Sequence, residues 1–156
     1  MIEVVTMEKT TFAAPPQRFE AGTQMTSQVV GLGAAVKFLS ELGMDNIHAH
    51  EQDLTAYALE KLNAIEGLTI VGPTSPEDRG AALSFQVEGI HPHDLGQVLD
   101  DHGVAIRVGH HCAWPVHRTM GVQSTARASF YLYNTRDEID VLAEAIVAAK
   151  NFFGVN

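Results

Sequence analysis

Residues 81–87 read Ala-Ala-Leu-Ser-Phe-Gln-Val, with apolar side chains at every second position and polar or small ones between them. This period of two is typical of a β-strand that buries one face and exposes the other. The stretch therefore predicts a half-buried strand, and the segments on both sides of it predict the rest of the domain.

Upstream of this strand the pattern changes to the three- and four-residue steps of helices. One helix is predicted from Ser27 to a glycine stop at Gly43, and a second from a capping Asp45 to Gly67. A strand over 68–71 and a turn-forming stretch over 72–80 then lead into residues 81–87.

Downstream, Pro92 predicts the first turn of a helix that ends at Gly103. A short strand over 104–108, a loop from Gly109 to about Ala126, and a strand over 128–133 follow. Thr135 and Glu138 form a T-x-x-E capping box for a last helix, stopped by Gly154.

The order of elements is two helices, two strands, a helix, two strands and a helix. Short connections favour antiparallel neighbours, so we expect an α+β fold with a mixed or antiparallel sheet packed by helices. Residues 1–19, broken by Pro15 and Pro16, are expected to be an arm or the remnant of another domain, and residues 20–156 the compact domain itself.

Composition excludes several functions. The chain has 156 residues, 46% of them hydrophobic, and no run approaches the ~18 apolar residues needed to cross a bilayer. Its 10 basic and 19 acidic side chains give a formal charge of −9, which opposes nucleic-acid binding. A single cysteine and the lack of a visible export signal predict a cytoplasmic protein.

The most unusual segment is 107–115, which reads Arg-Val-Gly-His-His-Cys-Ala-Trp-Pro. It places the lone Cys112 after two histidines in a loop entered through glycine. A thiol attacks only as thiolate, which nearby Arg or protonated His favours, so Arg107, His110 and His111 are candidate activators. The alternative is that Cys112 is a small buried hydrophobe, although such residues usually sit in apolar periodic runs.

This segment resembles the active-site loop of SufS-type (group II) cysteine desulfurases, through the pattern R-x-G-H-H-C-x-x-P. Two other strings agree in order: Arg-Phe-Glu-Ala-Gly-Thr at 18–23, and Arg-Ala-Ser at 127–129 followed by Tyr-Asn-Thr at 133–135. The resemblance implies the small C-terminal domain of a fold-type I, pyridoxal phosphate-dependent enzyme. Residues 1–19 would then be a remnant of the large cofactor-binding domain.

The resemblance also implies roles for the loop residues. Cys112 would take sulfur from L-cysteine as a persulfide and leave L-alanine. Arg127 would bind the substrate carboxylate through two hydrogen bonds from its planar guanidinium. The alternative is that Arg127 is an ordinary surface charge at the edge of a strand. Arg107 is expected to line the same cleft, and His110 and His111 to orient the loop or move protons.

Gly22 and Thr23 match a Gly-Thr pair that contacts the cofactor phosphate of the neighbouring subunit, which implies a homodimer. Backbone N–H groups and a hydroxyl just before a helix suit an anion, although an ordinary lead-in to a helix has the same appearance. Pyridoxal 5'-phosphate is therefore the implied cofactor of the parent enzyme.

The chain departs from the family at the cofactor lysine, which the family carries in an upstream S/T-x-H-K string. Lys9, Lys37, Lys61 and Lys150 lie in other contexts. We therefore expect a C-terminal portion that is inactive alone. The parent enzyme would act on L-cysteine, with L-selenocysteine as the alternative, and would pass sulfur to an acceptor protein of the SUF system for iron–sulfur cluster assembly.

Other readings remain open at this point. A stand-alone sulfur-relay protein would accept persulfide on Cys112 instead of generating it. A Cys–His hydrolase would use Cys112 with His111 or His117 as its base. The side chains of neighbouring residues, however, seldom point at each other in the way this chemistry needs. A metal-binding module would use Cys112 with His110, His111 and His117, although adjacent histidines seldom ligate one tetrahedral ion, so no metal is expected.

Overall fold

The computed structural model describes residues 1–77 and 79–155. These divide into two compact units, Met1–Gly43 and Met44–Asn156, and each is described by itself. The predicted division after residue 19 falls inside the first unit, and the assignment of residues 1–19 to a larger domain stays a prediction. None of the helices in the described part of the chain is long and apolar enough to cross a membrane.

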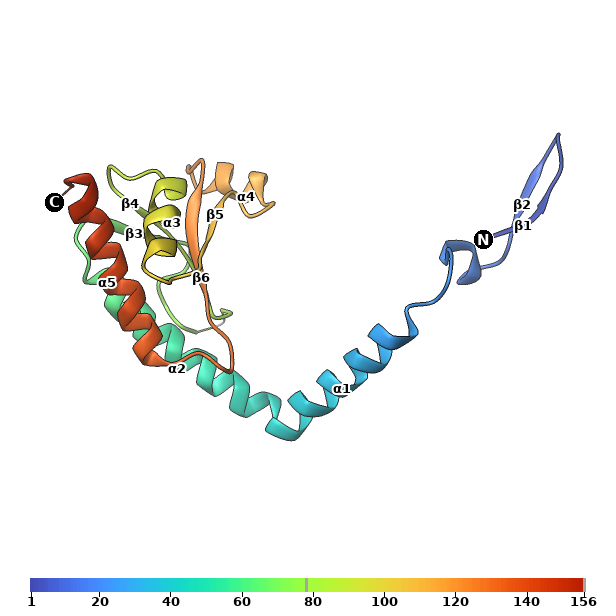
Figure 1. The fold of residues 1–156 in the computed structure, drawn as a ribbon, viewed down its shortest axis with the longest axis horizontal. Coiled ribbons are helices and arrows are strands. Elements are labelled where there is room, and N and C mark those ends of the chain that lie inside the picture. Colours follow the sequence, from blue (N-terminus) through green and yellow to red (C-terminus); the bar gives the residue numbers. More distant parts are fainter. Residues whose placement is uncertain (78, 156) are drawn as a thin grey trace. The chain divides into compact units, whose positions relative to one another are not determined.

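The first unit begins with an antiparallel hairpin of β1 (Ile2–Val5) and β2 (Thr10–Phe12) (Figure 1). Neither strand was predicted within the expected arm or domain remnant, because the turn between them contains no glycine, proline or asparagine. The Thr6 hydroxyl closes it instead, accepting hydrogen bonds from the N–H groups of Glu8 and Lys9. A 3-10 turn, η1 (Gln17–Phe19), and α1 (Thr26–Leu42) follow.

The second unit contains a four-stranded antiparallel sheet in the order β3-β4-β6-β5. Its strands are β3 (Leu68–Val71), β4 (Ala82–Val87), β5 (Arg107–Gly109) and β6 (Thr125–Ser129). Its helices are α2 (Met44–Asn63), α3 (Pro92–Asp101), α4 (Trp114–Thr119) and α5 (Arg136–Phe153). The predicted α+β class with a helix-packed antiparallel sheet is confirmed.

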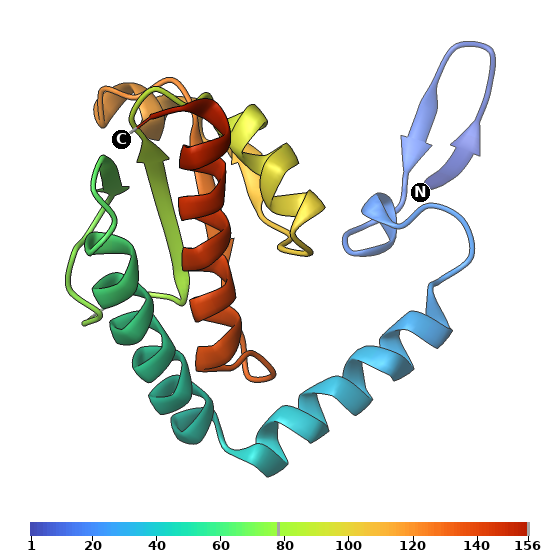
Figure 2. The same cartoon turned by 60° about the vertical axis from the view of Figure 1, so that its left-hand side comes forward.

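The core lies between one face of this sheet and the three longer helices, α2, α3 and α5 (Figure 2). The predicted alternation in β4 is confirmed, because Leu83, Phe85 and Val87 are buried in it. From α2 and α5, Leu62 and Ile146 pack into the same cluster and are fully buried. Burying a side chain of this size stabilises the fold by about 1.5–3 kcal/mol.

The other face of the sheet is polar and carries the residues of interest. Side chains alternate along a strand, so the residues between those of the core point to this second face. Registers align Arg127 of β6 with Ser84 of β4 on one side and with Arg107 of β5 on the other. Gly109 is aligned with Thr125 one step further along the same face.

Two strands and two helices of the second unit differ from the predictions. Asp45 lies inside α2 and does not cap it, and α2 ends at Asn63, four residues before Gly67. β5 was expected over 104–108 and β6 over 128–133, but the hydrogen-bonded ladder spans Arg107–Gly109 and Thr125–Ser129. The predicted loop from Gly109 to Ala126 contains α4, which has a proline in its first turn and no side-chain cap at Ala113. A six-residue helix without a capping side chain leaves little signal in a sequence.

Candidate functional site: the cysteine turn and the arginine pair

Cys112 lies in a tight turn between β5 and α4. The Ala113 N–H donates to the His110 carbonyl over 2.8 Å, and the central residues His111 and Cys112 have φ values of 51° and 60°. Left-handed φ at both central positions is the pattern of a type I′ turn, which glycine and asparagine usually occupy. Each ordinary side chain there costs about 1–2 kcal/mol. The turn thus holds an exposed thiol on a strained backbone.

The turn is anchored on both sides. Gly109 ends β5 with a φ of 109°, a conformation that side chains strongly disfavour. On the other side, the His110 ring stacks on the Trp114 indole at the start of α4, with ring centroids 4.8 Å apart. The Gly109 backbone conformation and the His110–Trp114 contact together define the path of the chain before and after Cys112.

Arg107 and Arg127 lie directly opposite each other on β5 and β6. Directly opposed residues have Cβ atoms about 4.5–5.5 Å apart, so the two like charges share a small area of the polar face. Among the residues that the structure describes, neither guanidinium forms a salt bridge, and the buried Nε of Arg127 has no hydrogen-bond partner. Two neighbouring cations without a paired carboxylate can attract an anion to this face.

A second set of contacts ties the turn to β6. The Thr125 hydroxyl is fully buried and lies 2.8 Å from His111 Nε2 and 3.2 Å from His117 Nε2. His117, which is 6% exposed, also bonds to the Ala113 carbonyl through Nδ1 over 3.1 Å. His111 is thereby held against the same sheet face that carries the arginines.

The charge state of His111 follows from these surroundings. Burial lowers the pKa of His111 below the ordinary 6.5, and the positive charges of Arg127, His117, Arg107 and His110 lower it further. His111 is therefore neutral at pH 7. The turn contains an imidazole that can accept a proton.

Five of the predicted site residues thus belong to one region of the second unit: Arg107, His110, His111, Cys112 and Arg127. Gly22 and Thr23 lie in the first unit, in the segment before α1. Sequence reasoning gave Thr125 no role and considered His117 only for a hydrolase or metal site. No spacing pattern links them to His111, because the contact depends on the β5–β6 register.

The segment before α1 fits a phosphate. Gly22 has a φ of 78°, and the first turn of α1 has neither a side-chain cap nor an acidic residue. The Thr26 N–H donates to the Gln24 carbonyl over 2.9 Å, which leaves the N–H groups of Ser27 and Gln28 available to an anion. Three of the four lysines that were considered for the cofactor form contacts within the chain instead. Lys61 pairs with Asp140 over 2.7 Å, Lys150 donates to the Glu66 carbonyl, and Lys37 pairs with Glu41 over 3.7 Å.

The metal-binding and hydrolase alternatives gain no support. The described residues contain no group of three or more His, Cys, Asp or Glu side chains that could hold a metal ion. Both candidate bases of a hydrolase, His111 and His117, direct Nε2 at the Thr125 hydroxyl.

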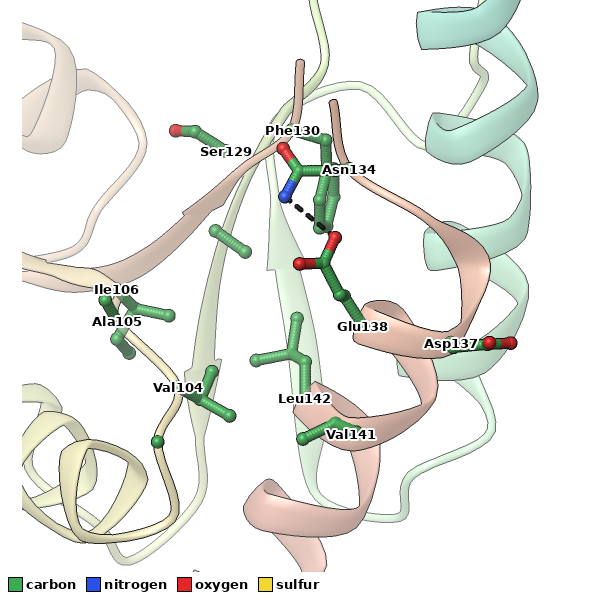
Figure 3. Close-up of a pocket in the computed structure, with 12 residues that line it drawn as sticks. Val104, Ala105, Ile106, Ser129, Phe130, Asn134, Asp137, Glu138, Val141 and Leu142 are labelled. Carbon is green, nitrogen blue, oxygen red and sulfur yellow. Dashed lines mark hydrogen bonds between the residues drawn. The ribbon is translucent and has the colours of Figure 1, made fainter. Parts of the chain in front are cut away.

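A cavity of about 400 Å³ lies elsewhere, between residues 103–106, the end of β6 and the first turns of α5. Figure 3 shows Ile106, Phe130 and Leu142 on its walls, with the Asn134 amide bonded to Glu138 at its edge. None of the predicted site residues lines it. The cavity is therefore not part of the site formed by the cysteine turn and the arginine pair.

Known proteins resemble the chain throughout. Its residues 1–142 match the family model for Aminotransferase class-V. Probable cysteine desulfurase 2 of Mycobacterium leprae is 59% identical over 154 residues, and a probable cysteine desulfurase of Streptomyces coelicolor is 54% identical over 154 residues. Each alignment covers 99% of this chain and 37% of the relative, so the chain spans just over a third of the length of these relatives.

Solved structures agree with the fold. The apo cysteine desulfurase from Thermococcus onnurineus NA1 superimposes with a TM-score of 0.82 at 35% identity, covering 99% of this chain and 38% of that one. The cysteine desulfurase CsdA (S-sulfonic acid) from Escherichia coli gives a TM-score of 0.82 at 30% identity, covering 97% and 37%. The predicted small domain of a fold-type I enzyme is confirmed, and the chain belongs to the aminotransferase class-V family.

Proposed function

We propose that this chain is the sulfur-accepting small domain of a cysteine desulfurase, in which Cys112 takes sulfur from L-cysteine as a persulfide and L-alanine is released. The observation that carries the proposal is the exposed Cys112 thiol at the second left-handed position of a tight turn. Strained backbone of this kind is retained where function needs it. The similarity to cysteine desulfurases over 99% of the chain supports the same activity.

Arg127 and Arg107 are suited to bind the α-carboxylate of the substrate. A planar guanidinium donates two parallel hydrogen bonds to a carboxylate, and the unpartnered Nε of Arg127 is a donor without an acceptor. A bound carboxylate would satisfy that donor and relieve the repulsion between the two cations. The site thereby favours an amino acid over a neutral thiol.

Gly22, Thr23 and the first N–H groups of α1 would hold the phosphate of pyridoxal 5'-phosphate. When bound, this group supplies the electron sink that weakens bonds next to the substrate's amino-bearing carbon. Its lysine is proposed to come from a part of the whole protein that is not in this sequence. Following the resemblance, the phosphate belongs to the partner subunit of a homodimer.

Cys112 then performs a displacement at sulfur. Its thiolate attacks the substrate sulfur, an S–S bond forms and the substrate Cβ–S bond breaks. The electron pair stays with the carbon fragment, which takes up a proton and leaves as L-alanine. An exposed turn lets the resulting persulfide meet a second protein, for which we propose a sulfur acceptor of the SUF system in the cytoplasm, serving iron–sulfur cluster assembly.

The test uses the whole protein encoded by the reading frame that carries these 156 residues. Release of L-alanine from L-cysteine should be lost in Cys112→Ser while the visible absorbance of bound cofactor remains. Arg127→Lys, which keeps the charge but loses the fork, should raise KM for L-cysteine by about tenfold, or ~1.4 kcal/mol. Comparison with L-selenocysteine measures the preference between the two substrates. Full alanine release by Cys112→Ser would refute the proposal.

The 156-residue chain alone is expected to release no L-alanine when given pyridoxal phosphate and L-cysteine, for want of the lysine. It should still accept sulfur from inorganic polysulfide, seen as a mass gain of one sulfur atom that a reductant removes and that Cys112→Ser abolishes. Alanine release by the chain alone would contradict the expectation that the reaction needs a lysine from the rest of the whole protein.

A further inference from the structure

The segment around the cysteine turn differs in charge from the rest of the chain. None of the 19 acidic residues lies between Asp101 and Asp137. The same stretch contains four of the ten basic residues, which are Arg107, Arg118, Arg127 and Arg136. A chain that is acidic as a whole therefore has one long segment without a negative side chain, and this segment contains Cys112.

Three of these four arginines have no acidic partner. Arg136 pairs with Asp53 on α2, whereas no salt bridge among the described residues involves Arg107, Arg118 or Arg127. Arg107 and Arg127 are the opposed pair on β5 and β6. Arg118 is exposed on α4, the helix that follows the cysteine turn directly. The positive charge of the site thus extends from the arginine pair onto the exposed side of α4.

Apolar side chains accompany Arg118 on this helix. α4 buries His117 and leaves three large apolar side chains about half exposed. These are Trp114, Val116 and Met120, at 54%, 58% and 47%. Residues four positions apart share one flank of a helix, which places Arg118 beside Trp114. Together, Trp114, Val116, Arg118 and Met120 are called the α4 patch.

The composition of the α4 patch is typical of a surface that binds another protein. Tryptophan, methionine and arginine are enriched in protein–protein interfaces. Single exposed apolar side chains are ordinary, but here three of them lie within seven residues, beside an unpaired cation. A partner that complements the patch carries negative charge and apolar side chains. A phosphate backbone would leave Val116 and Met120 uncovered, so the complement is a protein surface.

We propose that the α4 patch is the docking surface for the protein that accepts sulfur from Cys112, and that this acceptor presents its thiol on an acidic surface with apolar side chains. The inference rests on the proposed function, because it describes the partner of the same site. The acceptor thiolate attacks the outer sulfur of the Cys112 persulfide, and a new S–S bond forms. The bond between Cys112 and that sulfur breaks, and its electron pair leaves Cys112 as thiolate.

Thiol probes of opposite charge test the patch. The probes are the blocked peptide Glu-Leu-Cys-Leu-Glu, its counterpart Lys-Leu-Cys-Leu-Lys and the small uncharged thiol 2-mercaptoethanol. The 156-residue chain is loaded with sulfur from polysulfide at Cys112, its only cysteine, and loss of that sulfur is followed by mass spectrometry. For each probe, the rate with a variant is divided by the rate with wild type, which cancels the intrinsic reactivity of the probe.

Arg118→Glu should slow transfer to the glutamate peptide severalfold, speed transfer to the lysine peptide and leave transfer to 2-mercaptoethanol near wild type. Both peptide effects should shrink at high salt, because salt screens charges at the surface. Lys37→Glu is the matched control, since it makes the same charge change on an exposed residue of α1 and should alter none of the three rates. Equal ratios for the two peptides with Arg118→Glu would overturn the inference.

The apolar part of the α4 patch is tested by Val116→Ser combined with Met120→Ser. This double variant should slow transfer to Glu-Leu-Cys-Leu-Glu more than transfer to Glu-Ser-Cys-Ser-Glu, because only the first peptide has leucine side chains to bury. Equal ratios for these two peptides would show that α4 attracts any polyanion, and would overturn its assignment as a protein docking surface.

The Arg118→Glu measurement is then repeated with the whole protein encoded by the reading frame, following the fragment that contains Cys112. A charge effect seen in the 156-residue chain but absent from the whole protein would show that another part of that protein covers α4, and would overturn the inference. Failure of the desulfurase proposal is distinct. It appears as alanine release by Cys112→Ser, whereas sulfur loaded from polysulfide reports on transfer alone.

Discussion

At the scale of single residues, the site combines two unfavourable arrangements. Two consecutive non-glycine residues, His111 and Cys112, have left-handed φ, and two arginines face each other across neighbouring strands. Each arrangement costs stability that the core of the second unit must offset. The strained turn exposes the Cys112 thiol, and the arginine pair keeps two positive charges that an ion pair would neutralise.

The cost of the turn can be measured at Cys112. Cys112→Gly should be more stable than Cys112→Ala by about 1 kcal/mol, because glycine adopts a φ of 60° without a steric penalty. Both variants lack the thiol, so the comparison isolates the backbone. Urea unfolding followed by the fluorescence of Trp114, the only tryptophan, gives the difference. Equal stabilities would mean that the turn relaxes at Cys112.

The cost of the arginine pair is also measurable. Arg107→Gln should raise the free energy of unfolding by about 0.2–1 kcal/mol at low salt, because it removes a like charge directly opposite Arg127. High salt should shrink the gain by screening. Arg118→Gln is the matched control, since it makes the same charge change on the exposed side of α4. A loss of stability specific to Arg107→Gln would contradict the repulsion.

At the scale of elements, the position of the cysteine turn depends on how closely α3 approaches β5. Gly96 of α3 faces Val108 of β5, and a Cβ added at Gly96 would lie 2.8 Å from Val108 Cγ1. Val108 is β-branched and stiff at χ1, so it cannot simply turn away. The strand that leads into the Cys112 turn therefore needs glycine at position 96.

Gly96→Ala tests this contact. Alanine favours a helix interior over glycine by about 1 kcal/mol, yet we expect a net loss of stability and a shift of the Trp114 fluorescence as β5 moves. Adding Val108→Ala should recover the helix-propensity gain by making room. The double-mutant cycle from urea unfolding decides the matter, and additive effects would show that α3 and β5 do not press on each other there.

At the scale of the whole molecule, acid should weaken the fold in two windows. The pKa of His111 is lowered, chiefly by burial, so below pH 6.5 the unfolded chain binds more protons than the native one and stability falls. A second loss follows below about pH 4.5, where the lowered pKa values of Glu138, Asp140 and Asp53 act in the same direction. For these three, hydrogen bonds from Asn134, Lys61 and Arg136 respectively are the main cause.

His111→Gln separates the two windows. From about pH 7 to pH 5 the wild-type chain should lose stability more steeply than the variant, because only the wild type carries this shifted imidazole. Urea midpoints from far-ultraviolet circular dichroism at several pH values give both slopes. Identical slopes would show that protonation of His111 does not oppose the folded state.

Local patterns predicted most elements of the second unit. β3 lies at the predicted residues, Pro92 begins α3, and α5 is flanked by Thr135 and Gly154 as expected. These signals act within a few residues, through side-chain alternation, caps and glycine stops. β6 was placed three residues late because Ala126 carries little strand preference and interrupts the pattern after Thr125, and its true span is set by pairing with β4 and β5.

Sequence by itself determined the fold class and the family resemblance, and it marked Cys112 and the two arginines as candidate site residues, because each is indicated by periodicity or by a short motif. Only the tertiary structure brought Arg107 opposite Arg127 and placed His111 and His117 on one Thr125 hydroxyl. Those contacts depend on strand register and on the path of a strained turn. Both are decided by hydrogen bonds between segments that are far apart along the chain.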